Sequence, residues 1–366
     1  MSDRLLRLHS EHGQSPWLDN LKRSLLDDGS LATLRDGGVR GLTSNPTIFQ
    51  KAIQGSQDYD EQFRELVAAG SSVIDCYWQL VLADIRRAAD VFGSVYTSSG
   101  GGDGFVSVEV DPNLAHDTDA TLDAARHLWR QADRANLMIK VPATVEGLPV
   151  IRTLIAEGHN VNVTLIFGLD RYQKVMDAYI AGLEDLVAAG GDPSRVASVA
   201  SFFISRVDSD VDAQLESIAT DSALALRGRA AIAQARIAYE SFRRTFSGGR
   251  WEALVAAGAR VQRPLWASTS TKNPSYPDTL YVDELIGPDS VNTLPDQTLD
   301  AFADHGRLAR RLDIADSHEV WSSINSEGID MNAVADKLER EGVASFKKSF
   351  DDLLSALDAK RAELRS

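Results

Sequence analysis

Residues 137–144 read LMIKVPAT, an apolar run that a single charged side chain, Lys140, interrupts. A run of this length and composition predicts a buried strand. An ammonium group in a buried strand is costly unless a carboxylate pairs with it or it loses its proton. Since a neutral amine is a nucleophile, one interpretation is a lysine that attacks a carbonyl carbon and forms a Schiff base. The alternatives are a lysine paired with a carboxylate and a lysine whose ammonium reaches water at the strand end.

Similar apolar runs alternate with longer helical patterns along the chain. Candidate strands lie at residues 15–19, 38–43, 104–110, 136–141, 160–166, 195–202, 261–267 and 289–294. Helical periodicity between them covers, for example, 118–134, 169–189 and 206–246. This alternation of eight strands with helices predicts an α/β protein with a (β/α)8 TIM barrel rather than an open doubly wound sheet.

A chain of 366 residues is long enough for one large domain or two ordinary ones. All the candidate strands lie within residues 1–313, so we expect one barrel domain there. Residues 314–366 look helical over 332–341 and 345–364, and we expect them to form a C-terminal appendage packed on the barrel. The glycine-rich run at 100–104 lacks the lysine and hydroxyl of a P-loop and is predicted to be a loop.

Composition and charge exclude several classes of function. The net charge of −15 argues against nucleic acid or an anionic membrane as a partner, although local cations can still bind anionic metabolites. The single cysteine, Cys76, allows neither an intrachain disulfide nor a cysteine-based metal cluster, and its helical surroundings predict a core position. The polar N-terminus is no signal peptide, and no run of about 18 apolar residues exists, so we expect a cytoplasmic protein.

Polar residues recur in phase near the carboxyl ends of the candidate strands. In a barrel, alternate residues of each strand point inward. The in-phase polar residues are Asp19, Thr43, Asn45, Ser107, Glu109, Lys140, Asn162, Thr164 and Ser201. Barrel enzymes build their active sites at this end of the barrel. The pattern therefore predicts a catalytic site there, because stability alone does not account for it.

Structural roles are possible for several of these residues. Asp19 could cap a helix beginning at Asn20. Glu109 could serve only to neutralise Lys140.

Asn45 could cap a helix that has Pro46 at its first position, a role that is compatible with catalysis. Asn162 and Thr164 could simply bond to neighbouring side chains. Arg206, which is followed by several aspartates, could belong to a surface ion pair.

Five segments together resemble the transaldolases. They are GLTSNPTIF at 41–49, SVEVDP at 107–112, IKVPAT at 139–144, NVNVTLIF at 160–167 and SFFISR at 201–206. They follow the family's order, and the resemblance spans residues 15 to about 306. It implies a class I aldolase barrel and the transfer of dihydroxyacetone between sugar phosphates in the pentose phosphate pathway.

The resemblance also implies roles for individual residues. Lys140 resembles the Schiff-base lysine. Asp19 resembles the aspartate that moves the proton when the C3–C4 bond breaks or forms. Glu109 and Thr164 resemble the pair that holds a catalytic water.

Substrate-binding roles follow in the same way. Asn45 and Asn162 resemble the amides that bind substrate hydroxyls, and the in-phase Thr43 and Ser201 are counted with them.

The phosphate-binding residues include one departure from the family pattern. Arg206 and Ser268 resemble phosphate ligands, but the family's arginine two residues after the serine is missing. The nearest cation is Lys272, four residues on, as in the longer bacterial subgroup. Lys272 is therefore the expected replacement.

These roles predict a transferase that needs neither a metal nor an organic cofactor, since the lysine supplies the electron sink. Its expected donors are sedoheptulose 7-phosphate and fructose 6-phosphate, and its acceptors glyceraldehyde 3-phosphate and erythrose 4-phosphate. The rival functions are a Schiff-base lyase such as a fructose-6-phosphate aldolase, for which the chain is long, and a non-catalytic sugar-phosphate binder. The sequence does not predict the oligomeric state.

Overall fold

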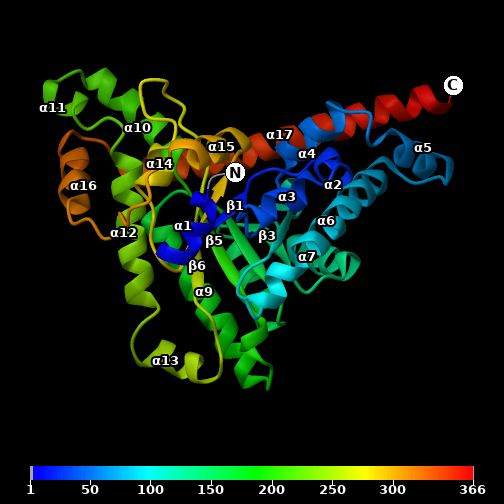
Figure 1. The fold of residues 1–366 in the computed structure, drawn as a ribbon, viewed down its shortest axis with the longest axis horizontal. Helices are drawn as coiled ribbons and strands as arrows, with labels where there is room; N and C mark the ends of the chain where they lie inside the picture. Colours follow the sequence, from blue (N-terminus) through cyan, green and yellow to red (C-terminus); the bar gives the residue numbers. More distant parts are fainter. Residues whose placement is uncertain (1–2, 366) are drawn as a thin grey trace.

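A parallel sheet forms the centre of the computed structural model, which describes residues 3–365 (Figure 1). Its seven strands follow the order β1-β7-β6-β5-β4-β3-β2. Their bounds are β1 Gln14–Leu18, β2 Val106–Glu109, β3 Leu137–Pro142, β4 Val161–Ile166, β5 Ser198–Phe203, β6 Gln262–Ala267 and β7 Ser290–Leu294. The predicted α/β class is confirmed, and each of these strands overlaps a predicted one.

The segment predicted as a strand at 38–43 is not assigned as a regular strand, and within it only Leu42 forms β-bridges. Leu42 forms isolated parallel bridges with Leu18 of β1 and with Val106 of β2, so it touches both edge strands of the curled sheet. Gly41 explains part of this irregularity, because a Cβ there would lie 2.6 Å from the ring of Trp17. The backbone of residues 40–43 still hydrogen-bonds to both edges of the sheet. The amides of Arg40 and Thr43 donate to the carbonyls of Pro16 and Leu18, and the amide of Leu42 donates to the carbonyl of Phe105.

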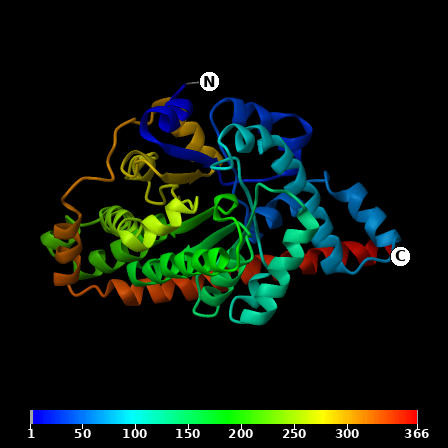
Figure 2. The ribbon, with the colours of Figure 1, turned by 90° about the horizontal axis from the view of Figure 1, so that it is seen from below.

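Helices surround the sheet (Figures 1 and 2). They are α1 Arg4–His12, α2 Arg23–Asp27, α3 Ser30–Asp36, α4 Pro46–Gln54, α5 Asp60–Ala68, α6 Val73–Ser98, η1 Pro112–Leu114, α7 Thr118–Ala132, α8 Gly147–Ala156, α9 Leu169–Ala188, η2 Pro193–Arg195, α10 Ser205–Ile218, α11 Asp221–Leu224, α12 Ala230–Thr245, α13 Gly249–Ala256, α14 Leu280–Asp283, α15 Asp296–His305, α16 Ser317–Ser326 and α17 Met331–Arg365. Among residues 3–365 no helix is both long enough and apolar enough to cross a membrane.

Two predicted helices agree closely with α7 and α9, but the predicted helix at 206–246 is wrong as one element. It is divided into α10, α11 and α12. Ala219 ends α10 in the left-handed conformation, with φ at +59°, and the side chain of Thr220 caps α11. Cys76 is buried in α6, as predicted.

The C-terminal segment forms α16 and a single long helix, α17. The break predicted between 341 and 345 is wrong, because helical backbone runs through it. Figure 2 shows α17 running along the side of the molecule opposite α1. It packs against α4, α6, α10, η1 and β4. The division of the chain at residue 313 stays a prediction.

A buried charge cluster closes the amino end of the sheet. The carboxylate of Asp103 accepts hydrogen bonds from Ser15 at 2.5 Å, Trp17 at 2.9 Å and Arg40 at 2.7 Å, and lies 3.5 Å from Arg263. Burial alone would raise the pKa of Asp103, but the charges of Arg263 and Arg40 outweigh it and hold the pKa below its usual range.

We expect Asp103→Asn to lower the free energy of unfolding by about 3 kcal/mol at pH 7, because it leaves two partly buried guanidinium groups without their carboxylate. Since the folded pKa is depressed, this contribution is present above the unfolded pKa of about 3.9 and is lost as pH falls through the folded pKa. Urea unfolding followed by circular dichroism at several pH values measures it.

Asp123→Asn is the matched control, because that side chain is 82% exposed and lies 3.6 Å from Arg126. Its expected effect is within about 0.5 kcal/mol. Equal effects of the two substitutions at pH 7 would contradict the assignment of Asp103 as a stabilising charge.

Candidate active site

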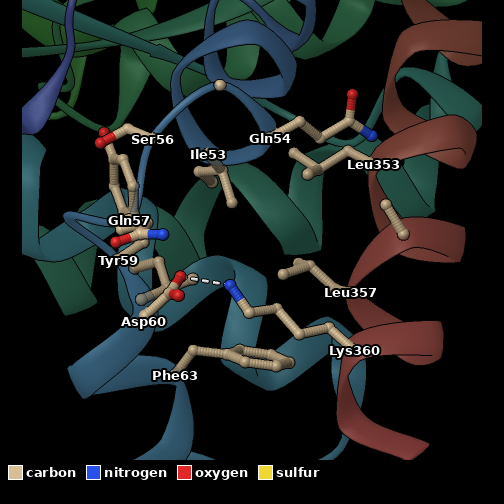
Figure 3. A pocket seen from close by; sticks show the side chains of 13 residues that line it. Ile53, Gln54, Ser56, Gln57, Tyr59, Asp60, Phe63, Leu353, Leu357 and Lys360 are labelled. Atoms are coloured by element: carbon tan, nitrogen blue, oxygen red, sulfur yellow. Dashed lines mark hydrogen bonds and ion pairs between the residues drawn. The ribbon is translucent and has the colours of Figure 1, made fainter. Parts of the chain in front are cut away.

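The predicted site residues gather around one cavity of about 130 Å³ at the carboxyl ends of the strands. All of them line it except Glu109 and Asn162. The full lining is Asp19, Thr43, Asn45, Lys140, Thr164, Ser201, Phe203, Arg206, Ala267, Ser268, Ser270, Lys272, Thr293, Pro295 and Phe346. A larger cavity of about 540 Å³ lies between the α4–α5 region and α17 and contains none of the predicted residues (Figure 3). Size alone would favour the larger cavity, but the converging titratable groups favour the smaller one.

Lys140 lies on β3 and is only 4% exposed. Its Nζ atom is 3.2 Å from Oε2 of Glu109, and it donates a hydrogen bond to the carbonyl of Ser44 at 3.2 Å. The pairing follows from the register, which sets Glu109 of β2 opposite Lys140. The ion pair considered as the alternative to a nucleophile is therefore present. The two roles are compatible, because a carboxylate at this distance can accept the proton that the amine must lose before it attacks a carbonyl.

Glu109 does not line the cavity and lies behind its wall, beside the amine of Lys140. Burial raises the pKa of Glu109, and the charge of Lys140 opposes this only in part. Its Oε1 atom and the hydroxyl of Thr164 are both buried without a hydrogen-bond partner among the described residues. Buried polar atoms of this kind usually bind a water molecule or act in catalysis. Both atoms thus fit the predicted role of holding a catalytic water, which stays a prediction.

Glu109→Gln is expected to slow both formation and hydrolysis of the Schiff base by roughly 10²-fold, because it keeps the shape of the side chain and removes the base. Quenching single turnovers with borohydride measures the rate at which the adduct forms. An unchanged rate would mean that the carboxylate only neutralises Lys140.

Asp19 follows β1 and faces the cavity beside two threonines. Its Oδ1 accepts a hydrogen bond from Thr43 at 2.8 Å, and the hydroxyl of Thr43 lies 2.6 Å from that of Thr293. Burial raises the pKa of Asp19, while the charge of Lys140 and the bond from Thr43 lower it. The capping alternative is wrong, because α2 begins only at Arg23. Asp19 is free to act on a substrate.

The two predicted amides have different surroundings. Asn45 caps α4 by accepting a hydrogen bond from the amide of Ile48 at 3.0 Å, and it also lines the cavity. Asn162 accepts a hydrogen bond from Ser201 at 2.7 Å and donates one to Ser107 at 3.0 Å. It does not line the cavity, and its hydrogen bond from Ser201 positions a residue that does. The predicted role of Asn162 in binding substrate hydroxyls stays a prediction.

Arg206, at the start of α10, is not held by the aspartates that follow it. Asp208 instead accepts hydrogen bonds from the amide of Ala231 at 2.7 Å and from the hydroxyl of Tyr281 at 2.8 Å. Among residues 3–365 no carboxylate lies within ion-pair distance of Arg206, whose guanidinium is 5.6 Å from the ring centroid of Phe203. The surface ion pair considered as an alternative is absent from the described part of the chain.

Lys272 joins Arg206 at the same wall. Its Nζ donates a hydrogen bond to Ser270 at 2.6 Å. Burial lowers the pKa of Lys272, and the nearby charges of Arg206 and Lys51 lower it further. The carboxylate of Asp19 opposes this shift only in part, and neither cation forms an ion pair among the described residues. Like charges grouped in this way favour an anionic ligand.

Ser268 lies between these cations and the strand end. Its backbone has a φ of +56°, a conformation that is strained for a serine. Its carbonyl accepts a hydrogen bond from the amide of Ser205 at 3.0 Å, and the two hydroxyls are also 3.0 Å apart. The strained backbone thus ties the loop after β6 to the start of α10, which carries Arg206.

The sequence interpretation did not single out six of the lining residues, which are Phe203, Ala267, Ser270, Thr293, Pro295 and Phe346. Thr293 lies on β7, and the same alternation that identified the other polar residues would have identified it. Phe346 lies on α17, where it belongs to an ordinary amphipathic pattern. No local signal separates Phe346 from a core residue.

Comparison with known proteins identifies the family of the chain. The model of the transaldolase/fructose-6-phosphate aldolase family matches residues 16–357. The chain belongs to this family. The match includes every segment that carried the resemblance, so the predicted family is confirmed.

Several curated members of the transaldolase/fructose-6-phosphate aldolase family are similar over nearly the whole chain. A protein of Saccharopolyspora erythraea named transaldolase is 53% identical over 354 residues, which cover 95% of each chain. A transaldolase of Frankia alni is 51% identical over 361 residues, covering 98% of this chain and 97% of its own. A transaldolase of Mycolicibacterium smegmatis is 50% identical over 351 residues, covering 95% of both chains.

Proposed function

We propose that the protein is a transaldolase, a transferase that moves a dihydroxyacetone unit from sedoheptulose 7-phosphate or fructose 6-phosphate to glyceraldehyde 3-phosphate or erythrose 4-phosphate. Curated transaldolases about half identical over nearly the full length support this function. The observation that carries it in the structure is the buried amine of Lys140, paired with Glu109, on the wall of a cavity shared with Asp19.

The fold that fits this proposal is the full (β/α)8 barrel of the class I aldolases. The bridges of Leu42 to Leu18 and Val106 lie where the missing strand would close the sheet. The amide of Leu42 also donates to the carbonyl of Phe105 at 2.9 Å, and the amide of Ser107 donates to that of Leu42 at 3.0 Å. Residues 314–366 would then be a helical appendage across the barrel mouth.

The first chemical step builds the Schiff base. The phosphate of the ketose binds Arg206 and Lys272 with Ser268, which sets the C2 carbonyl near Lys140. Glu109 takes a proton from the amine, Nζ attacks C2, and the carbinolamine loses water to give an iminium ion. The water held by Glu109 and Thr164 carries these protons.

The second step breaks the carbon–carbon bond. Asp19 takes the proton of the C4 hydroxyl, the C3–C4 bond breaks, and its electron pair moves into the iminium to give an enamine. The aldose phosphate leaves, while Asn45 and Ser201 bind hydroxyls of the three-carbon unit. The same residues run the step in reverse when an acceptor aldehyde binds.

Borohydride trapping tests this proposal. Incubation with fructose 6-phosphate and borohydride should leave a reduced three-carbon adduct on Lys140, located by peptide mass spectrometry. Adding erythrose 4-phosphate before borohydride should discharge the adduct and form sedoheptulose 7-phosphate. Absence of an adduct would contradict the proposal and would favour a non-catalytic sugar-phosphate binding protein. Release of free dihydroxyacetone with no transfer would identify a lyase instead.

Arg206→Ala is expected to raise KM for phosphorylated substrates much more than it changes activity toward unphosphorylated analogues. It removes a charge-assisted hydrogen bond to phosphate, worth roughly 1.5–3 kcal/mol, or about 10- to 150-fold in kcat/KM. Lys272→Ala should show the same selectivity with a smaller effect. Steady-state kinetics with fructose 6-phosphate and with dihydroxyacetone as donors measure both.

The matched control is Arg152→Ala, whose guanidinium is 54% exposed and pairs with Asp185 on the outer surface. It should leave both donors unaffected. A loss of equal size for both donors in Arg206→Ala would mean that this cation holds the loops instead of the phosphate.

Other expectations remain predictions from the sequence alone. They are the cytoplasmic location, the absence of nucleic-acid partners and the lack of need for a metal or an organic cofactor. Residues 3–365 contain no group of three or more histidine, cysteine or acidic side chains placed to hold a metal ion.

A further inference from the structure

Phe346 is the one residue of the C-terminal helix α17 that lines the small cavity. Its ring centroid lies 5.8 Å from Nζ of Lys140, although 206 residues separate the two in the sequence. The ring is 4% exposed and therefore closes the wall of the cavity rather than projecting into water. No other described residue of α17 lines the cavity that holds this amine.

Contacts on either side of Phe346 fix its position along α17. One turn earlier, Gly342 lies so close to β4 that a Cβ there would be 2.9 Å from the side chain of Leu165. Leu165 itself sits at a register shift in β4 with φ at +60°, directly after Thr164. One turn later, the hydroxyl of Ser349 lies 2.8 Å from that of Thr47 in α4.

More distant ion pairs hold both ends of α17. Arg171 of α9 lies 3.3 Å from Glu339, and Asp210 of α10 pairs with Lys337. At the far end Lys360 pairs with Asp60 of α5, across the groove that Figure 3 shows. The helix is thus fastened to several elements around the mouth of the site, which makes Phe346 a fixed wall.

Phe350, one turn further along α17, packs against another helix instead of the cavity. Its ring packs against Tyr77 at 5.0 Å and against Trp78 at 6.3 Å, both in α6, and it does not line the cavity. Both phenylalanines belong to the apolar stripe that attaches α17. Of these two residues, only Phe346 lines the cavity beside the amine of Lys140. Phe346 can therefore affect the chemistry, whereas Phe350 contributes packing alone.

We propose that Phe346 keeps bulk water away from the enamine on Lys140, so that the three-carbon unit waits for an acceptor instead of being hydrolysed. This inference rests on the proposed transaldolase function. It assigns to Phe346 the preference for transfer of the three-carbon unit to an acceptor over its release as free dihydroxyacetone. An apolar wall beside a reactive intermediate suppresses its hydrolysis, because it removes the solvent that would donate the proton and attack.

The competing reaction is a complete hydrolysis. A proton derived from water adds to C3 of the enamine and gives an iminium ion. Water then adds its oxygen to C2 and returns a proton to the solvent. The C2–N bond breaks with its electron pair remaining on Nζ, and the nitrogen takes up the hydroxyl proton. One water is consumed for each dihydroxyacetone released.

The test compares Phe346→Ala with the wild-type protein, using fructose 6-phosphate as donor. Dihydroxyacetone released and sedoheptulose 7-phosphate formed are measured together at a fixed erythrose 4-phosphate concentration. The ratio of release to transfer should rise at least about tenfold in Phe346→Ala. Phe346→Leu, which fills part of the gap, should give an intermediate ratio. Because the readout is a ratio, it does not depend on the fraction of folded enzyme.

Phe350→Ala is the matched control on the same helix. It should lower thermal stability as much as Phe346→Ala and leave the ratio at the wild-type value. An unchanged ratio in Phe346→Ala and Phe346→Leu would overturn the proposal, as would an equal rise in Phe350→Ala. If Phe346→Ala does not fold, Phe346→Leu decides alone. A wild-type protein that forms no adduct and transfers nothing would instead refute the transaldolase function itself.

Discussion

Lys140→Arg is expected to abolish transfer while the protein keeps its fold. Arginine stays protonated and cannot form an imine, so the covalent step is lost and turnover should fall on the order of 10⁴-fold or more. The fold should persist because a guanidinium can still pair with Glu109, which lies 3.2 Å from the wild-type amine. A coupled assay measures the loss of transfer, and borohydride trapping measures the loss of the imine. Circular dichroism shows whether the fold is kept.

The control for this substitution is Lys348→Arg. That lysine lies on α17, is 75% exposed and pairs with Asp352 one turn away. It should turn over like the wild-type protein. Turnover of Lys140→Arg within about tenfold of wild type would exclude Lys140 as the nucleophile. Loss of the covalent step should lower turnover far more than that.

Asp19→Ala is expected to form the Schiff base and then to stall. The carboxylate is held by Thr43 at the strand end, where it can reach a substrate hydroxyl, whereas Glu109 is the carboxylate beside the amine. Turnover should fall roughly 10³-fold, because general base catalysis of carbon–carbon cleavage is lost. The trapped adduct should stay near the wild-type amount. If adduct and turnover fell together, Asp19 would be positioning Lys140 instead of moving the C4 proton.

The pH dependence gives a second check on Asp19. Burial raises its pKa above the ordinary carboxylate value, and a general base works only when it is ionised. Activity should therefore fall as pH drops through this raised pKa and recover above it. Asp19→Asn should remove that acid limb from the residual rate. If the pH–activity profile of Asp19→Asn kept an acid limb with the same midpoint, another group would have to cause it. Glu109 would be the first candidate.

Much of the site could be predicted because its signals are local. Strand alternation places Glu109, Lys140 and Thr164 on the inner face, and parallel strands bring their carboxyl ends together. The family segments around Lys140 and Arg206 pointed to the same cavity. Even Lys272, whose position departs from the family pattern, lines it beside Arg206.

Other features depended on contacts that local patterns do not encode. The segment around Leu42 looked like a regular strand, but the ring of Trp17 lies against Gly41 and β-bridges to the two edge strands form only at Leu42. Asn162 had the right phase for the cavity, yet hydrogen bonds from Ser201 and to Ser107 occupy most of its amide. Each outcome was decided by a neighbour distant in sequence.

The sequence by itself determined the α/β class, the family and the set of side chains that meet at the strand ends. Period-two alternation and short motifs carry that information, because they act over neighbouring residues. Only the tertiary structure decided the course of α17 and the place of Phe346 at Lys140. An amphipathic stripe says that a helix face is buried but not what it is buried against. The contribution of α17 to the wall of the site therefore follows from tertiary packing, which the sequence pattern of the helix does not specify.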